Sequence, residues 1–130
     1  MYTLTIHDHA KNDLRSLKIT EPRVAAVIVA LLQEIEGSQS LMDSLLDAGF
    51  GDNRDATFSV DKWKGFWNQQ KDIWRLKAWS LEKTGLMYRV IYAYHIKDSS
   101  FHILAVAPRS FDYDTSSGLG KRIESDYNDL

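Results

Sequence analysis

The chain has no cysteine, only two prolines among its 130 residues, and no long apolar run. The lack of cysteine excludes disulfides and thiolate metal sites, and it fits a reducing compartment. No apolar stretch approaches the ~18 residues that a membrane-spanning helix needs. The first residues, MYTLTIHDHAKND, lack the basic and then apolar pattern of a secretory signal. We therefore expect a soluble cytoplasmic protein with a single domain at residues 1–130 and no contact with membranes.

An excess of positive charge is also missing, since the formal net charge is −2. The charges are nevertheless unevenly distributed. Residues 61–109 hold 9 Lys and Arg against 4 Asp and Glu, whereas residues 1–60 hold 5 against 9. A local basic surface can attract a polyanion even when the whole molecule is mildly acidic. The alternative is that these cations only keep a β-sheet soluble.

The first part of the chain has the patterns of one strand and two helices. Alternation at residues 2–6 indicates a short strand, and residues 9–17 form a short amphipathic helix, which we expect Asp8 to cap. A longer apolar stripe follows at helical spacing, with Thr20 as the expected cap, Pro22 in the first turn and Gly37 at the end. This stripe is long enough to cover one face of a small sheet.

Three β-patterned segments then carry basic residues among large apolar ones: IWRLKAWSL, MYRVIYAYH and FHILAVAPR. Alternation places Arg75 and Lys77 on one face of the first segment, about 7 Å apart along the strand. In the third segment we expect the side chains at odd-numbered positions from Phe101 to Arg109 to share a face. Short turns join the segments, so the strands are antiparallel. Ser116 or Ser117 then caps a final helix.

These elements predict an α+β fold: a small antiparallel sheet, made of the N-terminal strand and a three-strand meander, with two N-terminal helices packed on one face and a C-terminal helix. Because helices both precede and follow the sheet, we expect all of them on the same face. Residues 38–72 are harder to interpret. They contain a short helix near residues 41–46, a polar loop at 52–55, and an irregular hairpin or lid at 58–67.

The sequences WRLKAW, MYRVIYAYH and ILAVAPRSFDY resemble the RelE/ParE superfamily of bacterial toxins from type II toxin–antitoxin systems. The resemblance covers residues 2–37 and 73–127, and it treats residues 38–72 as an insertion. It implies a RelE-like fold. It also implies a partner, because a cognate antitoxin protein neutralises these toxins.

Family members with ribonuclease activity enter the ribosome and cut mRNA. By position, the resemblance assigns their basic catalytic cluster to Arg75, Lys77, Arg89 and Arg109, and their late tyrosine to Tyr113. It therefore implies an mRNA endonuclease that inhibits translation without a cofactor. Two alternatives stay open: a ParE-like toxin that poisons DNA gyrase, which the low net charge favours, and a degenerate module that only binds an antitoxin.

Cleavage of RNA by its own 2′-hydroxyl fits these residue types. Arginine and lysine stabilise developing phosphate charge, and a lysine among other cations can serve as a base once its pKa is lowered. Each residue also has a structural interpretation. Arg89 could form a salt bridge with an acidic residue, Arg109 could cap a helix, and Tyr113 could be a core aromatic. Trp63, Phe66, Trp67 and Trp79 could stack on bases or pack in the interior.

The four histidines form two sequence pairs. His7 and His9 flank Asp8, but the sequence shows no third ligand for a metal, so we expect no metal site there. His95 and His102 flank a turn and could pair across two strands, where either could carry a proton at neutral pH.

Overall fold

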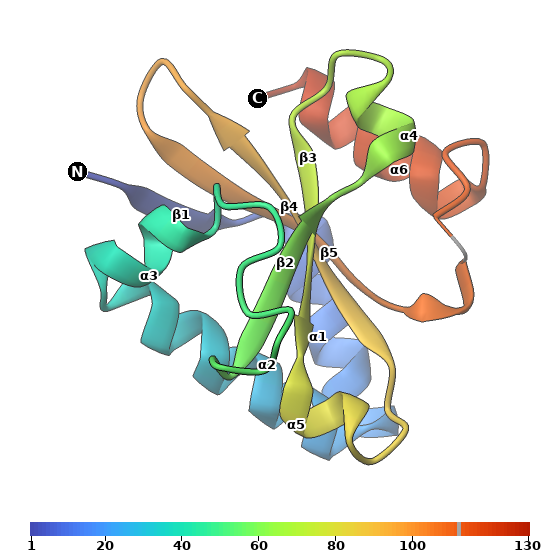
Figure 1. Cartoon of the computed structure of the whole chain (residues 1–130). Helices are drawn as coiled ribbons and strands as arrows, with labels where there is room; N and C mark the ends of the chain where they lie inside the picture. Colours follow the sequence, from blue (N-terminus) through green and yellow to red (C-terminus); the bar gives the residue numbers. More distant parts are fainter. Residues whose placement is uncertain (112) are drawn as a thin grey trace.

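The computed structural model describes residues 1–111 and 113–130, which form a five-stranded sheet with helices on both faces (Figure 1). In spatial order the strands are β1 (Thr3–Ile6), β5 (Ser100–Pro108), β4 (Tyr88–His95), β3 (Ile73–Ala78) and β2 (Phe58–Lys62). β1 pairs with β5 in parallel, and every other pair is antiparallel. The α+β class is thus confirmed, whereas the sheet is antiparallel only from β5 to β2.

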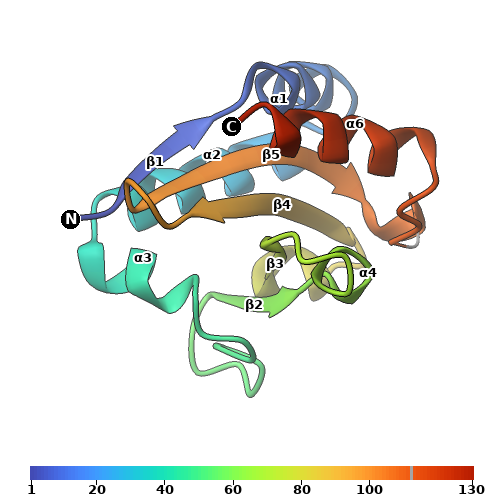
Figure 2. The same cartoon turned by 90° about the horizontal axis from the view of Figure 1, so that it is seen from above.

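Six helices and one 3₁₀ turn complete the described fold: α1 (Asp8–Thr20), α2 (Pro22–Glu36), α3 (Gln39–Ser44), α4 (Lys64–Trp67), α5 (Trp79–Glu82), the 3₁₀ turn Arg109–Phe111 and α6 (Gly118–Asn128). Figure 2 shows α1 and α2 beyond the sheet and α6 over β5.

α1 and α2 cover one face of the sheet. The apolar stripe of α2 is buried there with Leu17 of α1, and it packs with Trp74, Leu76 and Tyr92 from the strands. The expected caps were wrong. The side chain of His7, not Asp8, accepts a hydrogen bond from the N–H of His9, and Thr20 ends α1 instead of capping α2. Pro22 opens α2 and Gly37 ends it, as predicted.

α6 packs on the opposite face, so the prediction that all helices share a face is wrong. Ile123 of α6 is fully buried with Ile91 and Leu104 of the sheet and with Phe66 of α4. Ser117 caps α6, as predicted, by accepting a hydrogen bond from the N–H of Gly120. A sheet with apolar side chains on both faces needs a cover on both, and the sequence periodicity of one helix does not reveal which face it covers.

The segment expected to be a hairpin or lid instead forms the edge strand β2 and the short helix α4. β2 pairs with β3 in a register that sets Asp61 opposite Arg75 and Ser59 opposite Lys77. A strand of only five residues cannot be distinguished from an irregular loop by its length and composition, and the strand with which it pairs lies further along the chain. The edge strand therefore adds side chains to the face that carries Arg75 and Lys77.

A β-bulge divides β5 into two parts. Ile91 pairs with Ala105, but the next residue, Tyr92, pairs with Ile103, so Leu104 is the additional residue. A bulge shifts the alternation of side chains between the two faces. Ala105 consequently packs with the α6 side while Ile103 packs with the α1–α2 side, and the prediction that they share a face is wrong.

Candidate nucleic-acid site

Three of the predicted site residues meet on the α6 face of the sheet. Arg89 of β4 donates a hydrogen bond from Nε to the Tyr113 hydroxyl, with a nitrogen–oxygen distance of 2.9 Å. Arg75 of the neighbouring strand β3 donates to the same oxygen at 3.4 Å, and its guanidinium carbon lies 5.0 Å from the centre of the Tyr113 ring. Two cations from adjacent strands therefore converge on one phenol oxygen.

Tyr113 is held in place by a cluster of aromatic side chains. Its backbone carbonyl accepts a hydrogen bond from the indole nitrogen of Trp63 at 3.1 Å. Its ring lies edge-on to Trp63 and Phe111, with centroid distances of 5.5 and 4.9 Å. Its φ angle is +54°, a left-handed conformation that a bulky residue adopts at a cost. The backbone strain at Tyr113 is therefore offset by the contacts that hold its hydroxyl against the arginines.

Arg89 is buried, with 3% of its surface exposed. Its guanidinium forms an ion pair with Glu82 of α5, whose carboxylate oxygen lies 2.9 Å away. The second carboxylate oxygen of Glu82 is buried and has no hydrogen-bond partner within the described part of the chain. Arg89 therefore forms the structural salt bridge that its sequence position left open, and it also contacts Tyr113. No pattern in the sequence singled out Glu82, which ends the short helix α5.

Lys77 completes the cationic group. Leu76 of β3 pairs with Val90 of the antiparallel strand β4. Lys77, the residue after Leu76, is therefore next to Arg89, the residue before Val90. The Lys77 ammonium lies 4.6 Å from the centre of the Trp79 ring. Its partial burial, followed by the positive charges of Arg89 and Arg75, lowers the pKa of Lys77 below its usual value, although Glu82 and Asp52 act in the opposite direction.

A hollow of about 310 Å³ opens beside these cations. Its lining combines the two basic residues with acidic, hydroxyl and aromatic side chains: Asp52, Ser59, Asp61, Arg75, Lys77 and Trp79. Asp61 approaches Arg75 at 3.9 Å, and both side chains are partly exposed, so water screens this ion pair. We call the group Arg75, Lys77, Arg89 and Tyr113 with its adjoining hollow the cationic cluster.

Arg109 does not join this arrangement. It begins the 3₁₀ turn after β5, its side chain is exposed, and it borders a different hollow together with Glu21, Met87 and Pro108. Its backbone N–H donates to the carbonyl of Met87, which fixes the end of the strand. Arg109 does lie at the end of β5, as predicted. The chain turns at this point, however, and Tyr113, four residues later, reaches the cluster instead.

The histidines of the β4–β5 turn also lie elsewhere. His95 is six positions from Arg89 along β4, which corresponds to about 20 Å of strand. It contacts Asp98 at 3.0 Å, while His102 contacts the Ser100 hydroxyl at 2.8 Å. Their rings lie edge-on across β4 and β5 with centroids 6.5 Å apart, so the two histidines do sit beside one another, as expected. Neither can exchange a proton with a group bound at the cationic cluster.

The aromatic residues divide between interior and surface. Trp63 and Phe66 are buried, with 2% and 0% of their surface exposed, so they cannot stack on bases without unpacking. Trp67 and Trp79 are partly exposed, and each has a lysine over its ring: Lys62 at 4.2 Å and Lys77 at 4.6 Å. Only the latter two are placed for stacking.

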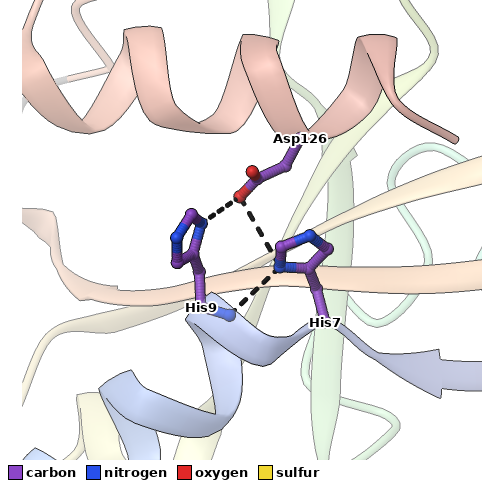
Figure 3. A group of neighbouring side chains, drawn as sticks. All are labelled: His7, His9 and Asp126. Carbon is purple, nitrogen blue, oxygen red and sulfur yellow. Dashed lines mark hydrogen bonds and ion pairs between the residues drawn. The ribbon is translucent and has the colours of Figure 1, made fainter.

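A second group of polar side chains lies at the start of α1 (Figure 3). His7, His9 and Asp126 of α6 have donor atoms within 4.8 Å of one another, a set that could hold a metal ion. The prediction of no third ligand was wrong, because Asp126 lies 117 positions from His9 in the sequence and only the packing of α6 brings it close.

No protein-family model matches the chain, and no match appears among curated proteins or among solved structures. In the described residues, none of the helices combines the length and the apolar character required to traverse a bilayer.

Proposed function

We propose that the protein is the toxin of a type II toxin–antitoxin system, with a RelE-like fold, and that it cuts mRNA on the ribosome at the cationic cluster. One observation carries the proposal: the Tyr113 hydroxyl accepts hydrogen bonds from both Arg89 and Arg75, beside Lys77 and an open hollow. Such a group has the components needed for cleavage of RNA by its own 2′-hydroxyl.

In this mechanism Tyr113 is the proton donor. A phenol oxygen has two acceptor sites and one proton. When both acceptor sites are directed at guanidinium groups, the proton points away from them. It can then be donated to the leaving 5′-oxygen or to a phosphate oxygen of a bound strand. The two arginines also stabilise negative charge that develops on the phosphate or on the phenol.

Lys77 is the corresponding base. Partial burial and two neighbouring arginines lower its pKa, so its neutral form is more accessible at physiological pH than that of an ordinary lysine. The neutral amine can accept the proton of the 2′-hydroxyl. Arg75 is half-buried, and its ion pair with Asp61 is long, at 3.9 Å. It is therefore the cation best placed to bind the backbone phosphate.

The proposal includes a partner and a location. A cognate antitoxin protein, encoded alongside, would neutralise the toxin in the cytoplasm. An acidic segment of such a partner would fit over the cationic cluster and cover it. Co-expression followed by purification tests this point, and a toxin that remains alone in the presence of the neighbouring gene product would contradict it.

The activity itself is tested by adding purified protein to a translation extract and mapping the ends of the message by primer extension. We expect cleavage by the native protein and its loss in the Arg75→Ala and Lys77→Ala variants. Arg15→Ala removes an exposed arginine on α1, away from the sheet strands, and is the matched control that should keep full activity.

Intact message at a high dose of folded protein would overturn the endonuclease proposal. If gyrase then accumulates cleaved DNA complexes in the presence of the protein, the ParE-like alternative replaces it. If neither effect occurs and growth continues when the protein is expressed alone, the antitoxin-binding module is the remaining interpretation.

A further inference from the structure

We propose that His7, His9 and Asp126 form a binding site for one divalent transition-metal ion of the Zn²⁺ class, which ties α6 to the start of α1. The site lies apart from the cationic cluster, and the inference does not depend on the proposed endonuclease activity.

The donor atoms already lie close to coordinating positions. The Asp126 carboxylate oxygen is 2.7 Å from Nδ1 of His9 and 3.6 Å from Nδ1 of His7. Two ligands of a tetrahedral zinc ion, each about 2.0–2.1 Å from the metal, are separated by roughly 3.3 Å. The two observed separations lie on either side of this value, so small rotations of the side chains suffice. Figure 3 shows both imidazoles directed at the same carboxylate oxygen.

The burial of Asp126 indicates that a cation belongs there. Only 7% of its side chain is exposed, and a buried carboxylate requires a positive partner. Within the described residues no lysine or arginine pairs with it. Arg122, one turn earlier in α6, contacts Asp13 instead, at 2.8 and 3.1 Å. The groups around the Asp126 carboxylate are thus imidazoles, which are also good metal ligands.

The backbone holds the two histidines in place. The N–H of His7 donates to the carbonyl of Ile103 at 2.9 Å, which extends the β1–β5 pairing by one residue. Nδ1 of His7 also accepts from the N–H of His9 at 3.1 Å and so caps α1. A metal would compete for that lone pair. Metal binding at His7 therefore replaces the helix cap with a stronger bond, and the ring keeps nearly the same position.

The donor set selects the class of ion. Two imidazole nitrogens and one carboxylate oxygen suit Zn²⁺, Co²⁺ or Ni²⁺ and do not suit Mg²⁺ or Ca²⁺, which prefer oxygen ligands. Side-chain exposures of 29% for His7 and 46% for His9 leave an entry path and room for water as a further ligand. Since α1 and α6 come from opposite ends of the chain, the ion would act as a cross-link between them.

The test is a titration of the full, tag-free chain with Zn²⁺ by calorimetry, together with the visible absorption spectrum of the Co²⁺ form. We expect one ion per chain, an increase in thermal midpoint on binding, and no competition from excess Mg²⁺. His7→Gln and His9→Gln should each weaken binding at least tenfold. His95→Gln removes a different histidine and should leave the affinity unchanged.

Asp126→Asn should also abolish binding where circular dichroism shows that the variant folds. If it does not fold, the two glutamine variants decide, since both retain the buried carboxylate. The proposal is overturned if the native chain binds no stoichiometric Zn²⁺, or if His95→Gln weakens binding as much as His9→Gln does. The second result would mean that exposed histidines bind metal non-specifically.

Discussion

The hydroxyl of Tyr113 accepts hydrogen bonds from two arginines on neighbouring strands, and this contact defines the cationic cluster at the scale of residues. Arg89 is held by Glu82 in the interior, whereas Arg75 and Lys77 border the hollow. The cluster therefore has a rigid interior half and an accessible half. The two halves should respond differently to substitution, and each can be tested by changing a single functional group.

Tyr113→Phe removes only the oxygen that Arg89 and Arg75 contact, while the ring still packs against Trp63. Loss of a general acid should lower the rate of mRNA cleavage by about 10²–10⁴-fold with little change in substrate affinity. The measurement is single-turnover cleavage in a translation extract. Tyr127→Phe is the matched control, because its hydroxyl accepts from the backbone N–H of Asp72, just before β3. Equal rates for the native protein and Tyr113→Phe would remove Tyr113 from the mechanism.

The lowered pKa of Lys77 predicts a pH dependence. Burial and the nearby Arg89 and Arg75 favour the neutral amine, and a base acts only in its neutral form. The rate should therefore rise with pH below the pKa of Lys77, on the order of tenfold per pH unit, and level off above it at a pH below the usual lysine value. Lys77→Arg keeps the charge but cannot lose its proton in this range, so its residual rate should show no such rise. A rate profile shared by both proteins would show that another group is the base.

At the scale of elements, β2 supplies the outer wall of the hollow. Asp61 and Ser59 of this edge strand lie opposite Arg75 and Lys77 of β3. The loop before β2 is tied to the strand at Val60, whose N–H donates to the carbonyl of Phe50 and whose carbonyl accepts from the N–H of Gly49. The carbonyl of Gly51, the residue after Phe50, accepts a hydrogen bond from the Trp79 indole at 2.8 Å. A segment with no helical stripe and no long alternation thus contributes directly to the site.

Gly51→Ala tests this loop. The φ angle of Gly51 is +75°, and an added Cβ would lie 1.9 Å from the carbonyl oxygen of Phe58. Because the clash is with backbone, it cannot be relieved by a side-chain rotation, and we expect a loss of about 2–3 kcal/mol in the free energy of unfolding. Urea denaturation measures it. Gly118→Ala, where an added Cβ meets nothing within 4 Å, should cost little. An unchanged Gly51→Ala midpoint would mean that the loop does not hold β2.

At the scale of the whole molecule, the net charge of −2 means that long-range attraction does not favour RNA. Binding must come from the local cations of the cluster. Of these cations, Arg75 and Lys77 are accessible from the hollow, whereas Arg89 has only 3% of its surface exposed. The affinity for a single strand should therefore depend on salt less steeply than that of a strongly basic nucleic-acid-binding protein.

This dependence can be measured with a single-stranded oligodeoxyribonucleotide, which lacks the 2′-hydroxyl and is therefore not cleaved. Single strands give a slope of about −0.7 in log affinity against log salt per phosphate contacted, so two contacts predict a slope between roughly −1 and −2. Lys77→Ala should reduce the slope by about one contact, and Arg15→Ala should not change it. A slope that is the same in Lys77→Ala would place the phosphate contacts outside the cluster.

The amino-acid sequence alone determined the elements with strong periodicity and the local chemistry of the cluster. The stripe of α2, the alternation of β3 and β4, and the shared face of Arg75 and Lys77 follow from spacings within a few residues, whereas Arg89 was assigned by resemblance. Such patterns are local, since one face of a helix or strand must be apolar to be buried. Tyr113 could be named from the sequence, but its contact with the arginines could not.

Only the tertiary structure decided what depends on contacts between distant parts of the chain. It placed β2 at the sheet edge, α6 on the face opposite α1 and α2, and Arg109 outside the cluster. It also brought Asp126 to His7 and His9 from the other end of the chain. These outcomes depend on which apolar surfaces find one another and on a single bulge in β5, and neither leaves a periodic signal in the sequence.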